Sequence, residues 1–167
     1  PMPNTYTSPT DAIAVGREPA VLPEYEVVNL LDDWTRLQPP WDEYVHSHPK
    51  GCVFHTSQMV RVFQQTRGNK PLALASMTAD GRIAALLVSV RVQTLPPPMG
   101  RLSSRAVFYA EPLCSDHPDS MKALSQLLAF HDARVRRSVL FAEVRPLFAP
   151  GSERVVLERA GYSHLEY

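Results

Sequence analysis

Two long apolar runs joined by a short polar turn form the strongest pattern in the sequence. Leu72–Met77 and Ile83–Val92 are separated by Thr78–Gly81, which ends in Asp-Gly. This dipeptide is typical of a β-hairpin turn, because Gly accepts the positive φ that the turn requires. A third apolar run, Leu102–Tyr109, follows a proline-rich break. The runs are largely apolar and partly β-branched, so they predict a three-stranded antiparallel meander that is covered on both faces.

The segment before the hairpin predicts one strand and a first helix. A short strand is expected over Tyr25–Leu30. Pro39 and Pro40 are expected to close the turn that follows, with Pro40 at the first position of the helix. The apolar face of this helix recurs at a spacing of three and four residues and consists of Trp41, Tyr44 and Val45. His48–Gly51 contains Pro and Gly and is expected to end the helix.

A second helix is expected just before the hairpin. Val53–His55 is interpreted as an extended connector, after which Thr56 or Ser57 caps the helix. The buried side of the helix is expected to carry Met59, Val60 and Phe63.

A long helix and three short elements are expected after the meander. Asp119 is expected to cap the helix, whose apolar positions sustain the helical period over four turns: Met121, Leu124, Leu127, Leu128 and Val135. Val139–Val144 predicts a short buried strand, Glu153–Ala160 a helix ended by Gly161, and Tyr162–Tyr167 the start of a last strand. The expected order is β-α-α-β-β-β-α-β-α-β, a single α+β domain over residues 24–167 whose last strand is cut short. Residues 1–23 hold five prolines and no hydrophobic period, which predicts a disordered tail.

Composition argues against several classes of partner. The 167-residue chain carries 17 basic and 17 acidic residues, so it has no global field that would attract nucleic acid or an anionic membrane. No apolar run reaches the roughly 18–20 residues of a membrane span. Cys52 and Cys114 lack CxxC spacing, which is typical of two reduced thiols. A soluble, cytoplasmic protein is therefore expected.

Four polar or aromatic residues on the later strands are candidates for substrate binding. Glu143 and Arg145 are two residues apart on an expected strand and therefore share one face. Arg105 and Tyr109, on the third meander strand, can join them across the sheet. A buried carboxylate and guanidinium on one face either bind a polar ligand or form an internal ion pair, and the pattern leaves both readings open.

Other reactive side chains have simpler interpretations. His46 and His48 lack the i, i+4 spacing that shares a metal, so a solvated helix end is expected and no metal site is predicted. His131 is expected to flank the apolar stripe of the long helix. Cys114 has no His or Asn pattern that would make it a nucleophile. Trp41, Tyr44 and Phe54 are interpreted as core packing.

The order of elements resembles the GNAT acyltransferase superfamily, and several segments resemble its FemAB-like branch. The matching text is Trp41–Val45 with His48-Pro49, Phe54–Thr56, Gly81–Ile83, Leu102–Ala106, Glu111–Leu113, Glu143–Phe148 and Gly161-Tyr162. The best-known FemAB-like proteins transfer amino acids from aminoacyl-tRNA to peptidoglycan precursors and have two GNAT-like halves. The resemblance spans Tyr25–Tyr167 and implies an N-terminal half, or a remnant of one, that binds substrate or serves as a scaffold.

The segment that would hold a coenzyme A donor departs from the GNAT pattern. Enzymes of this superfamily that use acyl-CoA carry (Q/R)-x-x-G-x-(G/A) before a helix, where backbone amides and the helix N-terminus bind the pyrophosphate. The corresponding segment, Glu111–Ser120, has no glycine, two prolines and three carboxylates. We therefore expect no cofactor on this chain alone: acetyl-CoA or aminoacyl-tRNA is a donor by resemblance, bound by a second GNAT-like half. The alternatives are a non-catalytic interaction module that assembles, as a homodimer for example, through an exposed sheet edge, and a self-sufficient acyl-CoA N-acyltransferase, which this segment disfavours.

Overall fold

The computed structural model describes residues 25–95, 103–117, 119–149 and 151–163. The predicted tail at 1–23, the break at Pro96–Pro98 and the end of the expected last strand lie outside these residues; Tyr162 and Ser163 are described and are not in a strand. The strands are β1 (Glu26–Asn29), β2 (Asn69–Met77), β3 (Ile83–Gln93), β4 (Ser104–Phe108), β5 (Leu113–Cys114) and β6 (Phe141–Val144). The helices are α1 (Trp34–Ser47), α2 (Ser57–Gln65), α3 (Ser120–Val135) and α4 (Glu153–Arg159), with a short 3₁₀ helix η1 (Val53–His55).

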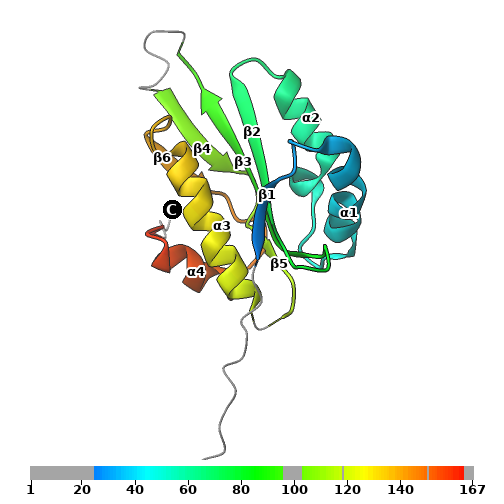
Figure 1. Cartoon of the computed structure of the whole chain (residues 1–167). Helices are drawn as coiled ribbons and strands as arrows, with labels where there is room; N and C mark the ends of the chain where they lie inside the picture. Colours follow the sequence, from blue (N-terminus) through cyan, green and yellow to red (C-terminus); the bar gives the residue numbers. More distant parts are fainter. Residues whose placement is uncertain (1–24, 96–102, 118, 150, 164–167) are drawn as a thin grey trace, which may run out of the picture.

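The strands form one mixed sheet in the order β1-β2-β3-β4-β6, and β5 pairs with β3 beyond the end of β4. The pairs β1–β2, β2–β3, β3–β4 and β3–β5 are antiparallel, whereas β4 and β6 run parallel. Helices α1 and α2 cover one face and α3 lies across the other, with α4 beside α3 (Figure 1). The predicted α+β class and the central antiparallel meander are confirmed.

The hairpin at the centre of the sheet forms as its turn sequence predicts. Gly81 has φ +81°, the left-handed conformation that a side chain would disfavour. Thr78 N donates to the carbonyl of Arg82, and Gly81 N donates to that of Thr78. The central parts of the two strands, Ala73–Ser76 of β2 and Ile83–Val90 of β3, are buried on both sides, in agreement with their continuous apolar composition.

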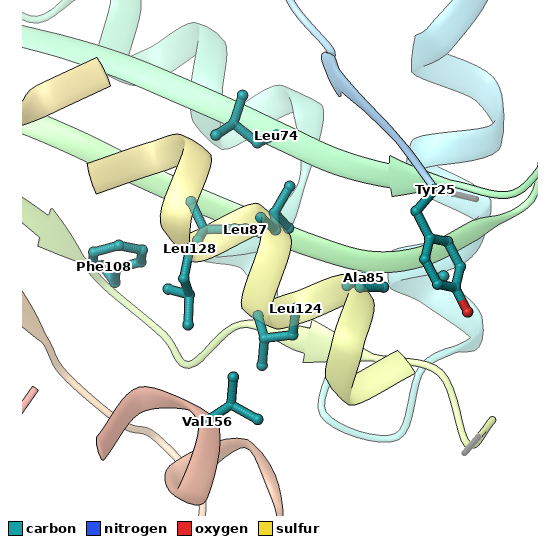
Figure 2. Packing of buried hydrophobic residues seen from close by; sticks show 11 residues of the cluster. Tyr25, Leu74, Ala85, Leu87, Phe108, Leu124, Leu128 and Val156 are labelled. Atoms are coloured by element: carbon teal, nitrogen blue, oxygen red, sulfur yellow. The ribbon is translucent and has the colours of Figure 1, made fainter. Parts of the chain in front are cut away.

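Each face of the sheet has its own hydrophobic core. Successive residues of β3 point to opposite faces, so Leu86 packs toward α1 and α2 while Leu87 packs toward α3. The cluster on the α3 side is shown in Figure 2, where Leu124 and Leu128 pack with Leu74, Leu87 and Phe108. No described helix is long and apolar enough to cross a bilayer.

Helix α1 runs through the two prolines that were expected to precede it. Pro39 and Pro40 lie inside Trp34–Ser47. Proline removes the hydrogen bond to the carbonyl four residues earlier, and here those carbonyls belong to Thr35 and Arg36, which are exposed to water. The helix continues because its buried residues recur every fourth position: Leu37, Trp41 and Val45. Tertiary burial therefore outweighs the local cost of the prolines.

Four smaller expectations are corrected by the structure. Val53–His55 forms the 3₁₀ helix η1 rather than an extended connector. Strand β6 begins at Phe141 and is half-exposed, because it is the last strand in the order of the sheet. Asp119 precedes α3 without a side-chain capping bond. His131 lies wholly in the core rather than on its flank, where its ring contacts Phe108. The Thr56 cap is confirmed: Thr56 Oγ1 accepts from Met59 N at 3.3 Å.

Candidate functional site

The candidate site lies where the parallel strands β4 and β6 end. The pairing reaches Phe108 and Val144, and Arg145 N donates the next bond to the carbonyl of Phe108. Beyond this point the chain leaves β4 and continues to β5, which pairs with β3 on the side away from β6. We call the side chains gathered here the β4–β6 site: Arg105, Tyr109, Glu111, Glu143 and Arg145.

The four substrate-binding candidates from the sequence are brought together. Glu143 Oε1 lies 2.5 Å from Arg145 Nη2 and 3.9 Å from Arg105 Nε. The parallel register sets Arg105 opposite Phe141, which lies two residues before Glu143 on β6. These side chains are 30 to 49% exposed, so the expected burial of the pair is wrong. The charges are partly solvated and accessible from outside.

An aromatic stack forms one wall of the site. Tyr109 stacks on Phe63 of α2 with ring centroids 5.2 Å apart and on Phe54 of η1 at 5.6 Å. The Arg145 guanidinium carbon lies 5.5 Å from the centre of the Tyr109 ring, a cation–π distance. Phe54 is therefore half-buried at the edge of the site. Its ring packs on Tyr109, which in turn contacts the Arg145 guanidinium.

Glu111 belongs to the site, although the sequence placed it only in the disfavoured donor segment. Its side chain is buried, and Oε2 accepts from Leu147 N at 3.0 Å. Oε1 is buried and has no hydrogen-bond partner among the described residues. Buried polar atoms are nearly always paired, so an open carboxylate oxygen is a reason to look for a donor. The signal in the sequence is a lone carboxylate between Val107 and Leu113, a stretch that is otherwise uncharged.

His55 fixes the backbone of Glu111 from the other side. Its Nε2 is 2.8 Å from the Glu111 carbonyl, which can only accept, so Nε2 carries the proton. Cys52 N donates to Nδ1 at 3.3 Å, so Nδ1 is an acceptor. Both nitrogens are therefore satisfied in the neutral ring. Burial lowers the pKa of His55, and the bond to Glu111 opposes this shift only in part.

The lowered pKa of His55 predicts a loss of stability in mild acid. The unfolded chain binds a proton near pH 6.5 whereas the folded chain resists it, so the free energy of unfolding falls as the pH drops below about 6.5, by at most about 1.4 kcal/mol per pH unit. In urea denaturation between pH 5 and 8, His55→Gln is expected to flatten this dependence. An equal slope in wild type and His55→Gln would contradict the assignment.

The segment before α3 does not fit a pyrophosphate. Asp119 N donates to His117 Nδ1 and Ser120 N to the His117 carbonyl, so these amides are already engaged within the turn. Asp116 and Asp119 add negative charge. Glu111 differs from the expectation that it repels phosphate there, because its carboxylate turns to Leu147.

The remaining reactive side chains have structural partners. His46 Nδ1 contacts the Asp42 carbonyl at 2.6 Å, and His48 Nε2 contacts the Cys114 carbonyl at 2.8 Å. Burial raises the pKa of Cys114 to about 12, so this half-buried thiol stays protonated and is a poor nucleophile. Among the described residues, no group of three or more His, Cys, Asp or Glu side chains is placed to hold a metal ion.

Solved structures of acetyltransferases share this architecture. No family model and no curated protein sequence matches the chain. A structure described as a probable acetyltransferase matches with a TM-score of 0.57 at 9% identity, covering 84% of this chain and 91% of its own. A predicted acetyltransferase with acetyl-CoA from Clostridium acetobutylicum matches at 0.53 and 10% identity, over 86% and 91%. Glucosamine-6-phosphate N-acetyltransferase from Arabidopsis thaliana matches at 0.54 and 10% identity, over 86% and 95%. At these identities the likeness concerns the fold: the chain has the fold of the GNAT acetyltransferases.

Proposed function

We propose that this chain is the N-terminal half, or a remnant, of a FemAB-like acyl or aminoacyl transferase, and that it binds the amine acceptor rather than the acyl donor. The observation that carries the proposal is the contrast between two places in the same fold. The segment before α3 carries carboxylates and engaged amides, which suit no phosphate. The β4–β6 site instead presents two accessible guanidinium groups beside the carboxylate of Glu143.

The chemistry of the β4–β6 site suits a ligand that carries both an amine and a carboxylate. A guanidinium has five N–H donors, so Arg105 and Arg145 keep donors for a ligand carboxylate while they contact Glu143. The partly exposed carboxylate of Glu143 offers an acceptor for an amine. Acyl transfer to an amine depends largely on positioning the amine and stabilising the oxyanion, so an acceptor-binding unit needs no nucleophilic side chain of its own.

A direct test is calorimetric titration of the chain with a lysine-bearing peptidoglycan stem peptide. We expect saturable binding that Arg145→Gln weakens about tenfold or more, since hydrogen bonds between charged groups contribute about 1.5–3 kcal/mol. Arg154→Gln is the matched control: it removes the same charge from an exposed i, i+4 pair on α4 and is expected to leave binding unchanged. A thermal-shift titration with acetyl-CoA is expected to give no saturable shift.

Each arm has an outcome that would overturn its part of the proposal. A ligand at a hundredfold excess over its Kd stabilises the folded chain by about 2.7 kcal/mol, so a bound donor would be visible as a clear shift. Such a shift with acetyl-CoA would make the chain a self-sufficient acyl-CoA enzyme instead. A folded chain that does not bind the peptide, or equal weakening by Arg145→Gln and Arg154→Gln, would refute acceptor binding at the β4–β6 site.

A further inference from the structure

A pocket of about 250 Å³ lies on the α3 side of the sheet. It is formed by the start of β2, the second half of β3 and the last turn of α3. Ser89 lines it and contacts His131 of α3, whereas Tyr109 of the β4–β6 site stacks on α2, so the two places lie on opposite faces of the sheet. The polar side chains around it are Asn29, Lys70, Ser89, Arg91, Arg134 and Ser138.

Among the described residues, the basic side chains of the pocket have no acidic partner. Lys70 is directly opposite Arg91 in the β2–β3 register, an arrangement of like charges that destabilises a sheet. Arg134 reaches the same pocket from the last turn of α3. None of the three forms an ion pair within the described parts of the chain. Asp132 is already engaged by His131 Nδ1 at 2.9 Å and by the Tyr162 hydroxyl at 3.0 Å.

The neutral polar groups of the pocket already have partners. Asn29 Nδ2 donates to Asp32 Oδ1 at 2.6 Å, and Ser138 Oγ donates to the Val135 carbonyl at 2.9 Å. Ser89 Oγ lies 3.0 Å from His131 Nε2. Asp132 accepts the proton of Nδ1, so Nε2 of a neutral ring accepts the serine proton. The main donors left for a ligand are therefore the cations, beside the second N–H of the Asn29 amide.

We propose that this pocket binds the phosphoryl group of a small phosphomonoester. Guanidinium groups match phosphate oxygens in a bidentate manner, and a cluster of three positive charges suits a group of charge near −2 better than a single carboxylate. The pocket is a small hollow that is open to solvent at Lys70 and Arg134, not a long basic track. The whole chain is also neutral, so the arrangement favours a small molecule over a nucleic acid. This inference does not depend on acceptor binding at the β4–β6 site.

The test is titration of the isotope-labelled full chain with inorganic phosphate and with glycerol phosphate, followed by amide NMR. Acetate at equal ionic strength is the control, because it is an anion with a single negative charge. We expect saturable shifts of the Ser89, Arg91 and Ala106 amides with both phosphates and none with acetate. Arg91→Gln and Lys70→Gln are each expected to raise the Kd about tenfold. Lys70 is exposed, so its variant tests the site without disturbing the core.

Arg82→Gln is the matched control for these variants. It removes one positive charge from the exposed hairpin turn, where Arg82 pairs with Asp80, and is expected to leave the Kd unchanged. Shifts that do not saturate, an equal response to acetate, or equal weakening in Arg82→Gln would each show unspecific charge attraction and overturn the proposal. Saturable binding of inorganic phosphate without glycerol phosphate would overturn the assignment to a phosphomonoester.

Discussion

Trp41→Ala is expected to lower the free energy of unfolding by about 5 kcal/mol, which is comparable with the whole stability of many single domains. Trp41 is completely buried in the cluster between the sheet and helices α1 and α2. Its Nε1 donates to the carbonyl of His55 at 2.7 Å. Removing the indole leaves a large cavity and also an unpaired buried carbonyl, and the two losses act together. Urea denaturation followed by circular dichroism measures the change.

Two further variants separate these losses. Trp41→Phe keeps most of the apolar volume but removes the donor to His55, so it is expected to cost about 1–3 kcal/mol and to remain folded for measurement. Val62→Ala, at a valine of α2 that is 53% exposed, is expected to change stability by less than about 0.5 kcal/mol. If Trp41→Ala fell within about 1 kcal/mol of Val62→Ala, the indole would not be the anchor of α1 that its burial implies.

The elements that the sequence predicted well are those fixed by local patterns. The hairpin follows from Asp-Gly between two apolar runs, and α3 follows from apolar residues at the helical period. The start of α1 was predicted too late, because the sequence shows the local cost of Pro39 and Pro40 directly. The burial of Leu37 on the same helix face as Trp41 depends on packing against the sheet, which the local pattern does not show.

The site divides in the same way. Glu143 and Arg145 share a face through the period of one strand, which is a local rule. Arg105 joins them only because β4 and β6 pair in parallel, and this crossover through α3 is a non-local contact. Glu111 was missed because a carboxylate in a short loop is usually solvated. Here its carboxylate accepts from the backbone N–H of Leu147 in the segment after β6, while His55 of η1 binds its backbone carbonyl.

Phe108→Ala is expected to cost about 4 kcal/mol through the other core. Phe108 is fully buried on the α3 side (Figure 2). Its ring lies 4.8 Å from that of His131 and 6.2 Å from that of Tyr162. It therefore joins β4 to both α3 and the segment after α4. Phe130→Ala, at a phenylalanine of α3 that is 41% exposed, is the control and is expected to cost much less.

The two cores lie on opposite faces of the sheet, so their contributions should be nearly independent. Trp41→Phe and Phe108→Leu are mild enough to combine, and their effects on the free energy of unfolding are expected to add within about 0.5 kcal/mol. A coupling energy well above this value would mean that the sheet transmits a packing change from the α1–α2 side to the α3 side. Additivity would mean instead that the α2 wall of the β4–β6 site can be altered without changing the α3 wall of the basic pocket at Lys70, Arg91 and Arg134. The two proposed sites can then be tested one at a time.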